Sequence, residues 1–339
     1  MKYSKIISFD GTSPSGGFGY VSAGLLAEIQ TRISAIKPEV GVLDNVEAFV
    51  GNSAGSWNAL YLASQKDPSA GLAGIVDFWT ELNQALSKMV SVVGGVGALA
   101  GAGSLLQSKP LCGFFCDYFG SRTKLGDLPH PVMITAFQLD APDATPRSWR
   151  ARVFDSGDPD GNDAEELVAD IAIRSSSPPV LEPIFQSITG KGPGYVDGGV
   201  FANNPSLVAY TQMLHRRKLG KTAFDDVLLL SCGNGEVPRY LAPRYRDGEA
   251  SWGYSQWLLD LCKPLVAIDM MIEASMMLTS FQCEQIMGDD YHRLDPFLGD
   301  GVHSFAMNNA LAKILAEPST QLQLDATVAW MHESGWLEA

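Results

Sequence analysis

The chain has 339 residues, of which 46% are hydrophobic and 18% are charged, so it is long enough to bury one large core or two smaller ones. Its 24 basic and 38 acidic residues give a net charge of −14, which argues against nucleic acid as a partner because phosphate binding needs a basic face. The same charge disfavours adsorption to an anionic membrane by electrostatics alone.

The chain begins with a strand-like segment. Residues 1–9 lack the apolar region and the small-residue cleavage site of a secretion signal. The cysteines form no pair of closely spaced CxxC motifs and have no nearby histidines to complete a zinc site. We therefore expect a reduced, cytoplasmic protein without a bound metal, in which these thiols are packing residues or incidental: Cys112, Cys116, Cys232, Cys262 and Cys283.

Strand-like and helix-like segments alternate along the chain, which predicts an α/β fold with three layers, a central, mainly parallel sheet flanked by helices. The expected strands are residues 6–9, 46–50, 132–139, 149–154 and 227–230. Apolar spacing predicts helices over residues 21–36, 57–63 and 205–219. Residues 251–288 are rich in Leu, Met, Ile and Trp, and we expect them to form core helices.

A glycine-flanked serine follows the second expected strand. Gly51-Asn52-Ser53-Ala54-Gly55 stands between an apolar run and a helix-like segment, which is the strand–turn–helix setting of a nucleophile elbow. Only glycine tolerates the crowding on either side of such a turn, where the serine hydroxyl is pushed clear of the backbone. The pattern is common by chance, but its context makes Ser53 a candidate nucleophile.

Residues 89–106 carry no charge and contain five glycines. Eighteen residues are near the lower limit for crossing a bilayer, but the glycines weaken a helix and the flanks lack aromatic anchors. The alternatives are a buried loop or broken core helix, and a mobile apolar flap over the active site. We expect the stretch to cover or border the mouth of the Ser53 pocket and not to span a membrane.

A second turn supplies a partner for the serine. Asp197 lies between a short apolar strand and two glycines, followed by a helix start. Asp-Gly-Gly by itself is a common turn signal. Together with Ser53 it becomes specific, because a carboxylate hydrogen-bonded to a serine hydroxyl can act as its general base and can later activate the water that releases the acyl group.

A Ser-His-Asp triad esterase would use the same serine differently. An elbow at residue 53 leaves room for only one or two strands before it, whereas the triad fold builds several first. No loop signal singles out a histidine for catalysis among His130, His215, His292, His303 and His332. We expect that none of them is required. A non-catalytic lipid-binding effector module is a third hypothesis.

Several segments, in the right order, resemble the patatin-like phospholipase family. Residues 51–55 are similar to its Gly-x-Ser-x-Gly elbow and residues 197–199 to its Asp-Gly-Gly, so the resemblance implies a catalytic dyad of Ser53 and Asp197. Further similar segments are residues 16–26, 173–179, 229–235 and 291–294. The resemblance covers residues 4 to about 295 of a single domain over residues 1–339, and leaves a helical extension over residues 296–339.

The resemblance implies a lipid acyl hydrolase, as a phospholipase A, a lysophospholipase or a carboxylesterase, that works through an acyl-enzyme without a metal or other cofactor. The expected partner is a fatty-acyl ester or phospholipid substrate. We expect the protein to bind it at a membrane surface, as a peripheral protein. The amides of Gly16, Gly17 and Gly19 are expected to form the oxyanion hole.

The first loop departs from the family pattern. Residues 12–15 stand between Gly11 and the glycines, and Phe18 stands where the family usually has a basic residue. An oxyanion hole needs backbone amides and not side chains, so the glycines can still supply it. The missing cation weakens the expectation of a phosphate-bearing head group.

Overall fold

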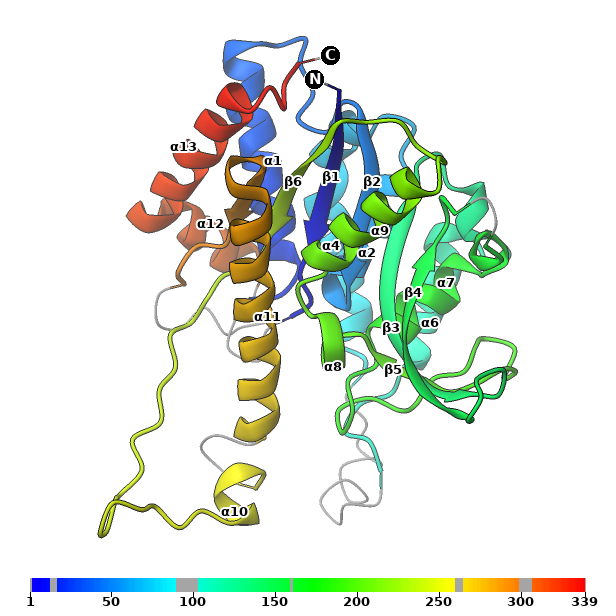
Figure 1. The fold of residues 1–339 in the computed structure, drawn as a ribbon, viewed down its shortest axis with the longest axis vertical. Helices are drawn as coiled ribbons and strands as arrows, with labels where there is room; N and C mark the ends of the chain where they lie inside the picture. The colour runs from blue at the N-terminus through cyan, green and yellow to red at the C-terminus, as the bar shows by residue number, and fades with distance from the viewer. Residues whose placement is uncertain are drawn as a thin grey trace.

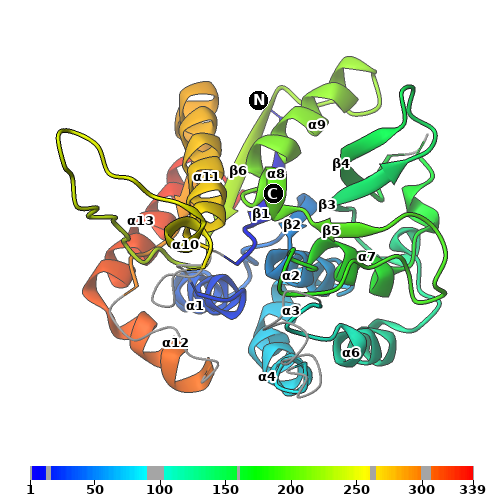
Figure 2. The same ribbon diagram turned by 90° about the horizontal axis from the view of Figure 1, so that it is seen from below.

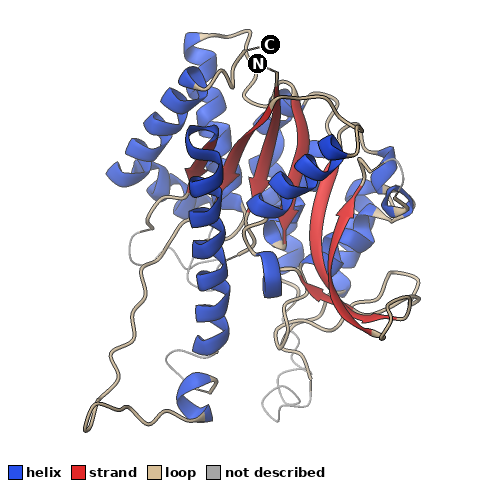
Figure 3. Ribbon diagram, in the orientation of Figure 1, coloured by secondary structure: helices blue, strands red, loops and turns tan. Residues whose placement is uncertain are grey.

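The computed structural model describes residues 2–12, 17–89, 103–158, 161–259, 265–298 and 307–338. A central sheet lies between layers of helices, as the red strands and blue helices of Figure 3 show. Its strands are β1 (Tyr3–Phe9), β2 (Val46–Asn52), β3 (Val132–Ala141), β4 (Ser148–Asp155), β5 (Tyr195–Asp197), β6 (Asp226–Cys232) and β7 (Tyr291–Leu294).

The sheet is mainly parallel. Its strands follow the order β4-β3-β2-β1-β6-β7, and β5 pairs with β3 beside this path. The pairs β1–β2, β1–β6, β2–β3 and β6–β7 are parallel, whereas β4 and β5 run antiparallel to β3. The expected α/β fold is therefore confirmed, and each of the five expected strands lies within an observed one.

Helices cover both faces of the sheet (Figures 1 and 2). They are α1 (Tyr20–Ile36), α2 (Ala54–Ala63), α3 (Pro68–Gly71), α4 (Ile75–Leu86), α6 (Lys109–Phe119), α7 (Val168–Ser175), α8 (Gly199–Ala202), α9 (Ser206–Lys218), α10 (Tyr254–Trp257), α11 (Val266–Met287), α12 (Met307–Ala316) and α13 (Pro318–Glu333). The helices expected over residues 21–36, 57–63 and 205–219 correspond to α1, α2 and α9.

The central strands are apolar on both faces because each face is covered. Ile7 and Phe9 of β1 pack into a core that contains residues of α1, α2, α4, α6 and α7. Ile6, which points the other way, packs with Ala209 of α9 and Cys283 of α11. Successive side chains of a strand point to opposite faces, so continuous apolar runs such as 46–50 are typical of a sheet buried on both sides.

The expectation of core helices over residues 251–288 is wrong. Residues 260–264 lie outside the described residues, and within α11 only Val266 and Cys283 are buried. Met277, near the middle of the helix, is 70% exposed, and the lower part of α11 extends below β1 and β6 (Figure 1). The composition of the segment is typical of a core, but among the described elements α8, α9 and β7 contact α11 without burying most of its side chains.

The two C-terminal helices share the main core. α12 and α13 both contact α1, and Leu324, Met331 and Trp336 belong to the same buried cluster as the strands. The indole N–H of Trp336 donates to the carbonyl oxygen of Val42 at 2.7 Å, which ties the end of the chain to the segment before β2. Within the described residues, no helix combines the length and the apolar character needed to cross a bilayer.

Candidate active site

Ser53 forms the turn between β2 and α2. Its backbone has φ 49° and ψ −126°, a left-handed conformation that is uncommon for a residue other than glycine, and α2 begins at the next residue. The flanking glycines are sterically required. A Cβ at Gly51 would lie 2.4 Å from the carbonyl oxygen of Gly55, and a Cβ at Gly55 would lie 2.3 Å from that of Phe9. The local geometry is that of a nucleophile elbow.

Strand register brings Asp197 to the elbow. Asn52, the last residue of β2, pairs with Thr135 of β3, and the next residue of β3 pairs with Asp197 at the end of β5. The Ser53 hydroxyl lies close enough to the Asp197 carboxylate to act on its pKa as a hydrogen-bonding neighbour. The two residues that the sequence singled out are therefore brought together.

The Asp197 carboxylate is buried, with 6% of the residue exposed. Burial raises its pKa to about 6, although hydrogen bonds from Ser53, the Gly199 amide and the Asn52 side chain act in the opposite direction. The Gly199 amide donates to Oδ1 at 2.7 Å and Asn52 Nδ2 donates at 3.2 Å. A carboxylate with this pKa is ionised at neutral pH and can still accept a proton.

Two asparagines that the sequence did not single out support the pair. Asn52 Nδ2 donates to both Asp197 and the side-chain oxygen of Asn203, and its own Oδ1 accepts from the Thr135 hydroxyl at 2.7 Å. Asn52 and Asn203 are buried. Their positions gave a signal in the sequence, because Asn52 lies inside the elbow motif and Asn203 follows the Asp-Gly-Gly turn. A single asparagine, however, forms no recognisable motif by itself.

The start of the first loop lies against the serine. The Gly11 amide donates to the carbonyl oxygen of Asn203 at 2.8 Å, and a Cβ at Gly11 would lie 3.1 Å from that of Ser53. The preceding Asp10 is buried and paired with Arg293, which also pairs with Asp295 after β7. This ion-pair network fixes the loop to the ends of β1 and β7.

The three glycines expected to form an oxyanion hole differ in their surroundings. Gly16 lies outside the described residues. The Gly17 amide donates to the carbonyl oxygen of Asn234 at 3.0 Å, so it already has a partner. Gly19 caps α1, and a Cβ there would lie 2.9 Å from the carbonyl oxygen of Ala54, which places the start of α1 beside the start of α2.

The described histidines have other surroundings. His130 precedes β3, at the end of the parallel sheet opposite to Ser53, and its ring packs against Phe49. His292 on β7 stacks on Trp330 with Nε2 2.9 Å from the Thr327 hydroxyl, and burial lowers its pKa to about 4. The remaining two in the described part of the chain are exposed on α9 and α13, namely His215 and His332, while His303 lies outside it.

Most of the uncharged stretch over residues 89–106, namely residues 90–102, lies outside the described residues. Its described ends are tied to the segment after α7. The Leu106 amide donates to the carbonyl oxygen of Leu181 at 2.8 Å, and the Gln107 amide donates to that of Met89 at 3.0 Å. This segment follows Ser175, the last residue of α7, whose hydroxyl accepts a hydrogen bond from the Ser53 amide at 2.8 Å. The base of the stretch is therefore joined by one short segment to the elbow.

Comparison with known proteins assigns the chain to a family. The model of the family described as patatin-like phospholipase matches residues 14–210, more than half of the chain. CotR of Bacillus subtilis and the protein teg of Priestia megaterium are each 28% identical over 317 residues, covering 86% of this chain and 87% of theirs. The solved structure of VipD from Legionella pneumophila aligns with 11% identity and a TM-score of 0.41, covering 96% of this chain and 67% of VipD. On the extent of the family match, the chain belongs to the patatin-like phospholipases, a family of lipid hydrolases.

Proposed function

We propose that this protein hydrolyses fatty-acyl esters of lipids, with Ser53 as the nucleophile and Asp197 as the general base. The observation that carries the proposal is that strand register places Ser53, held on a strained turn, at the same end of the sheet as the buried carboxylate of Asp197, whose pKa it influences. A nucleophile and a base within hydrogen-bond reach, with the base oriented by a third group, are the usual requirements for an activated serine. Asn52 is that third group.

The reaction proceeds in two halves. Asp197 takes the hydroxyl proton while Ser53 Oγ attacks the ester carbonyl carbon, and the proton then passes to the departing alcohol as the acyl-enzyme forms. In the second half, Asp197 removes a proton from a water molecule that attacks the acyl carbon. That proton then passes from Asp197 to Ser53 Oγ as the acid is released, which restores both the serine hydroxyl and the ionised carboxylate. Both halves need an ionised carboxylate at the start, which a pKa of about 6 provides at neutral pH.

The start of α2 supports an oxyanion hole. The first amides of an α-helix have no carbonyl one turn back to bond, and α2 begins at Ala54, directly after the nucleophile. The positive end of the helix dipole favours negative charge at the same place. We therefore propose the Ala54 amide as one donor to the oxyanion. Gly19, which lies beside Ala54, is the second donor that we propose, because the Gly17 amide has another partner.

The substrate side of the proposal is an apolar acyl chain presented at a lipid surface. Asn203, which supports the dyad, is 2.9 Å from the sulfur of Met276 on α11, so this helix borders the site. Met277 and Phe281, on the same helix, are exposed. Exposed apolar side chains on a helix that borders the site offer the kind of surface that a fatty chain requires.

The proposal is tested by covalent labelling and product release. A fluorophosphonate should add to the protein, and peptide mass spectrometry should locate the adduct on Ser53 alone. Fatty acid should be released from at least one member of a panel of acyl esters by the parent protein and not by Ser53→Ala. Equal release by a folded Ser53→Ala protein would overturn the assignment.

A further inference from the structure

A buried asparagine after β6 bonds to the first loop on both of its sides. Asn234 is 2% exposed, and its side-chain Nδ2 donates to the carbonyl oxygens of Asp10 at 2.9 Å and Gly11 at 3.2 Å, which directly follow β1. Its main-chain carbonyl oxygen accepts the Gly17 amide at 3.0 Å. One residue therefore holds the chain before and after residues 13–16, which lie outside the described residues.

The same side chain reaches the start of α1. The hydroxyl of Ser22 donates to Asn234 Oδ1 at 2.8 Å and accepts a hydrogen bond from Asn58 Nδ2 at 3.1 Å. Asn58 Nδ2 also donates to the carbonyl oxygen of Gly19 at 2.8 Å, and Asn58 Oδ1 accepts from the indole N–H of Trp79 at 2.7 Å. All of these side chains are buried, so the bonds form one network that is closed to solvent.

The network brackets the oxyanion donor proposed above. The Gly17 amide is fixed on one side of Gly19, and the Gly19 carbonyl oxygen is fixed on the other. The groups that fix them adjoin the nucleophile, because Gly11 lies against Ser53 and Asn58 lies on α2, which begins directly after Ser53. An oxyanion donor works only over a narrow range of distances, so this bracketing matters for catalysis.

An asparagine fits this place chemically. Its amide group supplies two N–H donors, which face two carbonyl oxygens, and one acceptor oxygen, which faces a hydroxyl. An ionised aspartate of the same shape would turn a lone pair toward the carbonyl oxygens, and an alanine would leave buried polar groups unpaired. The proposed reaction makes no use of Asn234 so far.

Building on the proposed ester hydrolysis, we propose that Asn234 is a positioning residue for the oxyanion hole. It acts through the first loop and not through contact with the substrate, and it keeps the Gly19 amide at the distance from Ser53 that the tetrahedral intermediate requires. Full negative charge develops on the carbonyl oxygen only in the reaction. Loss of this alignment should therefore weaken binding of the intermediate more than binding of the ester.

The first measurement separates kcat from KM on a soluble octanoyl ester. In Asn234→Ala, kcat should fall by about 10- to 100-fold, less than the loss of about 10²- to 10³-fold that follows removal of an oxyanion donor, because the donor is displaced and still present. KM should stay within about threefold, since ground-state binding is spared. Asn234→Asp keeps the shape of the side chain and should not restore turnover.

The second measurement uses a pair of inhibitors. With an octyl trifluoromethyl ketone, Ser53 Oγ adds to the carbonyl carbon, Asp197 takes the hydroxyl proton, and the carbonyl oxygen becomes an oxyanion. The octyl methyl ketone binds without this addition. In Asn234→Ala the inhibition constant of the first ketone should rise by the factor by which kcat/KM falls, and that of the second should stay constant. Ser22→Ala, which removes fewer bonds, should show the same pattern on a smaller scale and decides the question if Asn234→Ala does not fold.

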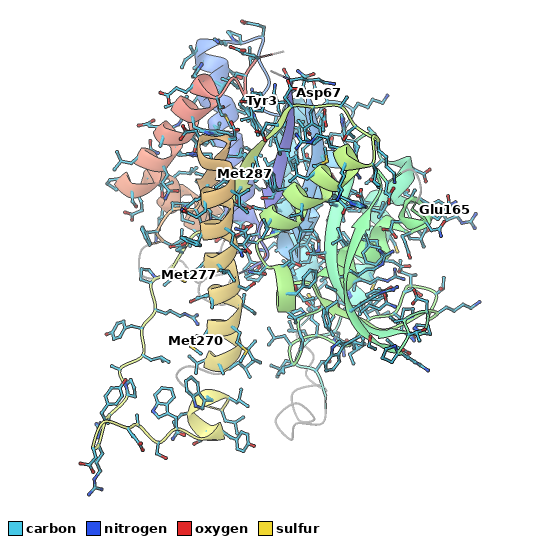
Figure 4. All side chains as sticks on the ribbon, in the orientation of Figure 1. Tyr3, Asp67, Glu165, Met270, Met277 and Met287 are labelled. Carbon is cyan, nitrogen blue, oxygen red and sulfur yellow. The ribbon has the colours of Figure 1, made fainter. Side chains whose placement is uncertain are left out.

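Ser69 provides the matched control. It is also buried and also joins two segments, because its hydroxyl accepts the Leu43 amide at 3.0 Å and donates to Asp44 Oδ1 at 2.9 Å. Figure 4 shows the neighbouring Asp67 at the same end of the molecule as Tyr3, where β1 begins, which is the end of the sheet opposite to the dyad. Ser69→Ala should lower thermal stability and leave kcat and both inhibition constants unchanged.

Three results would overturn the inference: parent-like kcat in a folded Asn234→Ala protein, an equal loss of kcat in Ser69→Ala, or equal weakening of both ketones. Each would reduce the role of Asn234 to stability. A parent protein that hydrolyses no acyl ester and takes no fluorophosphonate on Ser53 would instead overturn the proposed function on which the inference rests.

Discussion

The dyad and helix α11 lie next to each other but differ in which side chains they bury and which they expose. Around Ser53 and Asp197, the polar atoms of buried side chains are paired with one another, and Asn52 is completely buried. Along the lower part of α11, apolar side chains such as Met270 and Met277 are exposed (Figure 4). Only the upper end, near Met287, packs against the sheet and α9.

The difference has a physical reason. A buried polar group without a partner costs about 1–3 kcal/mol, so a buried reactive pair must be fully hydrogen-bonded and is held in one geometry. An exposed apolar surface has no such constraint and gains stability only when something covers it. The first region is thus suited to chemistry, and the second to contact with an apolar partner. Five predictions test this division.

The largest effect is expected at the dyad. Ser53→Ala and Asp197→Asn should each lower kcat by at least about 10³-fold, and the double variant should be no worse than either single one, because residues that act as a unit fail together. Circular dichroism should show that all three variants remain folded. Full turnover by a folded Asp197→Asn protein would remove the carboxylate from the mechanism.

The next effect is on stability at the elbow. Gly51→Ala would place a Cβ 2.4 Å from a backbone oxygen, so we expect the free energy of unfolding to fall by about 1–3 kcal/mol in urea denaturation. Gly113→Ala on α6 is the control, because its Cβ would meet no atom within 4 Å and alanine favours a helix. Equal stability of the two variants would show that the elbow is not crowded.

The pH dependence of the dyad reaction should follow Asp197. Because the general base must be ionised, and burial raises its pKa to about 6, kcat/KM should fall about tenfold per pH unit below that value. An exposed aspartate would move this limb down toward pH 4. The measurement is a pH profile with a neutral, soluble ester, and an acidic limb near pH 4 would contradict the buried environment.

A smaller effect is expected on α11. Met277→Ser combined with Phe281→Ser should lower hydrolysis of dispersed long-chain esters several-fold, since each buried apolar side chain contributes about 1.5–3 kcal/mol at most. Hydrolysis of a soluble short-chain ester should change little. Leu322→Ser is the matched control, because Leu322 on α13 is also about as exposed as Met277. Equal losses on both substrates would give α11 a structural role.

The smallest effects are expected at the histidines. Single replacements of His130, His215, His292, His303 and His332 should leave turnover within about tenfold, because loss of a general base typically costs 100-fold or more. His292 is the most informative of them, since it is partly buried and burial lowers its pKa to about 4. One folded variant without activity would favour a Ser-His-Asp triad over the dyad.

The sequence by itself determined the parts that depend on local patterns. Continuous apolar runs located the strands, because a sheet covered on both faces has no polar side to mark. The elbow was readable because its glycines are sterically required, as the close approaches at Gly51 and Gly55 show. The pairing of Ser53 with Asp197 was inferred from two turn motifs far apart in the chain.

Only the tertiary structure decided the features that depend on contacts between segments far apart in the chain. The pattern around Gly17 did not reveal that its amide bonds to Asn234, and the composition of residues 251–288 did not reveal that most of α11 stays at least partly exposed. Burial, hydrogen-bond partners and charge neighbours are set by long-range contacts, whereas a sequence motif records only the residues that are adjacent in the chain.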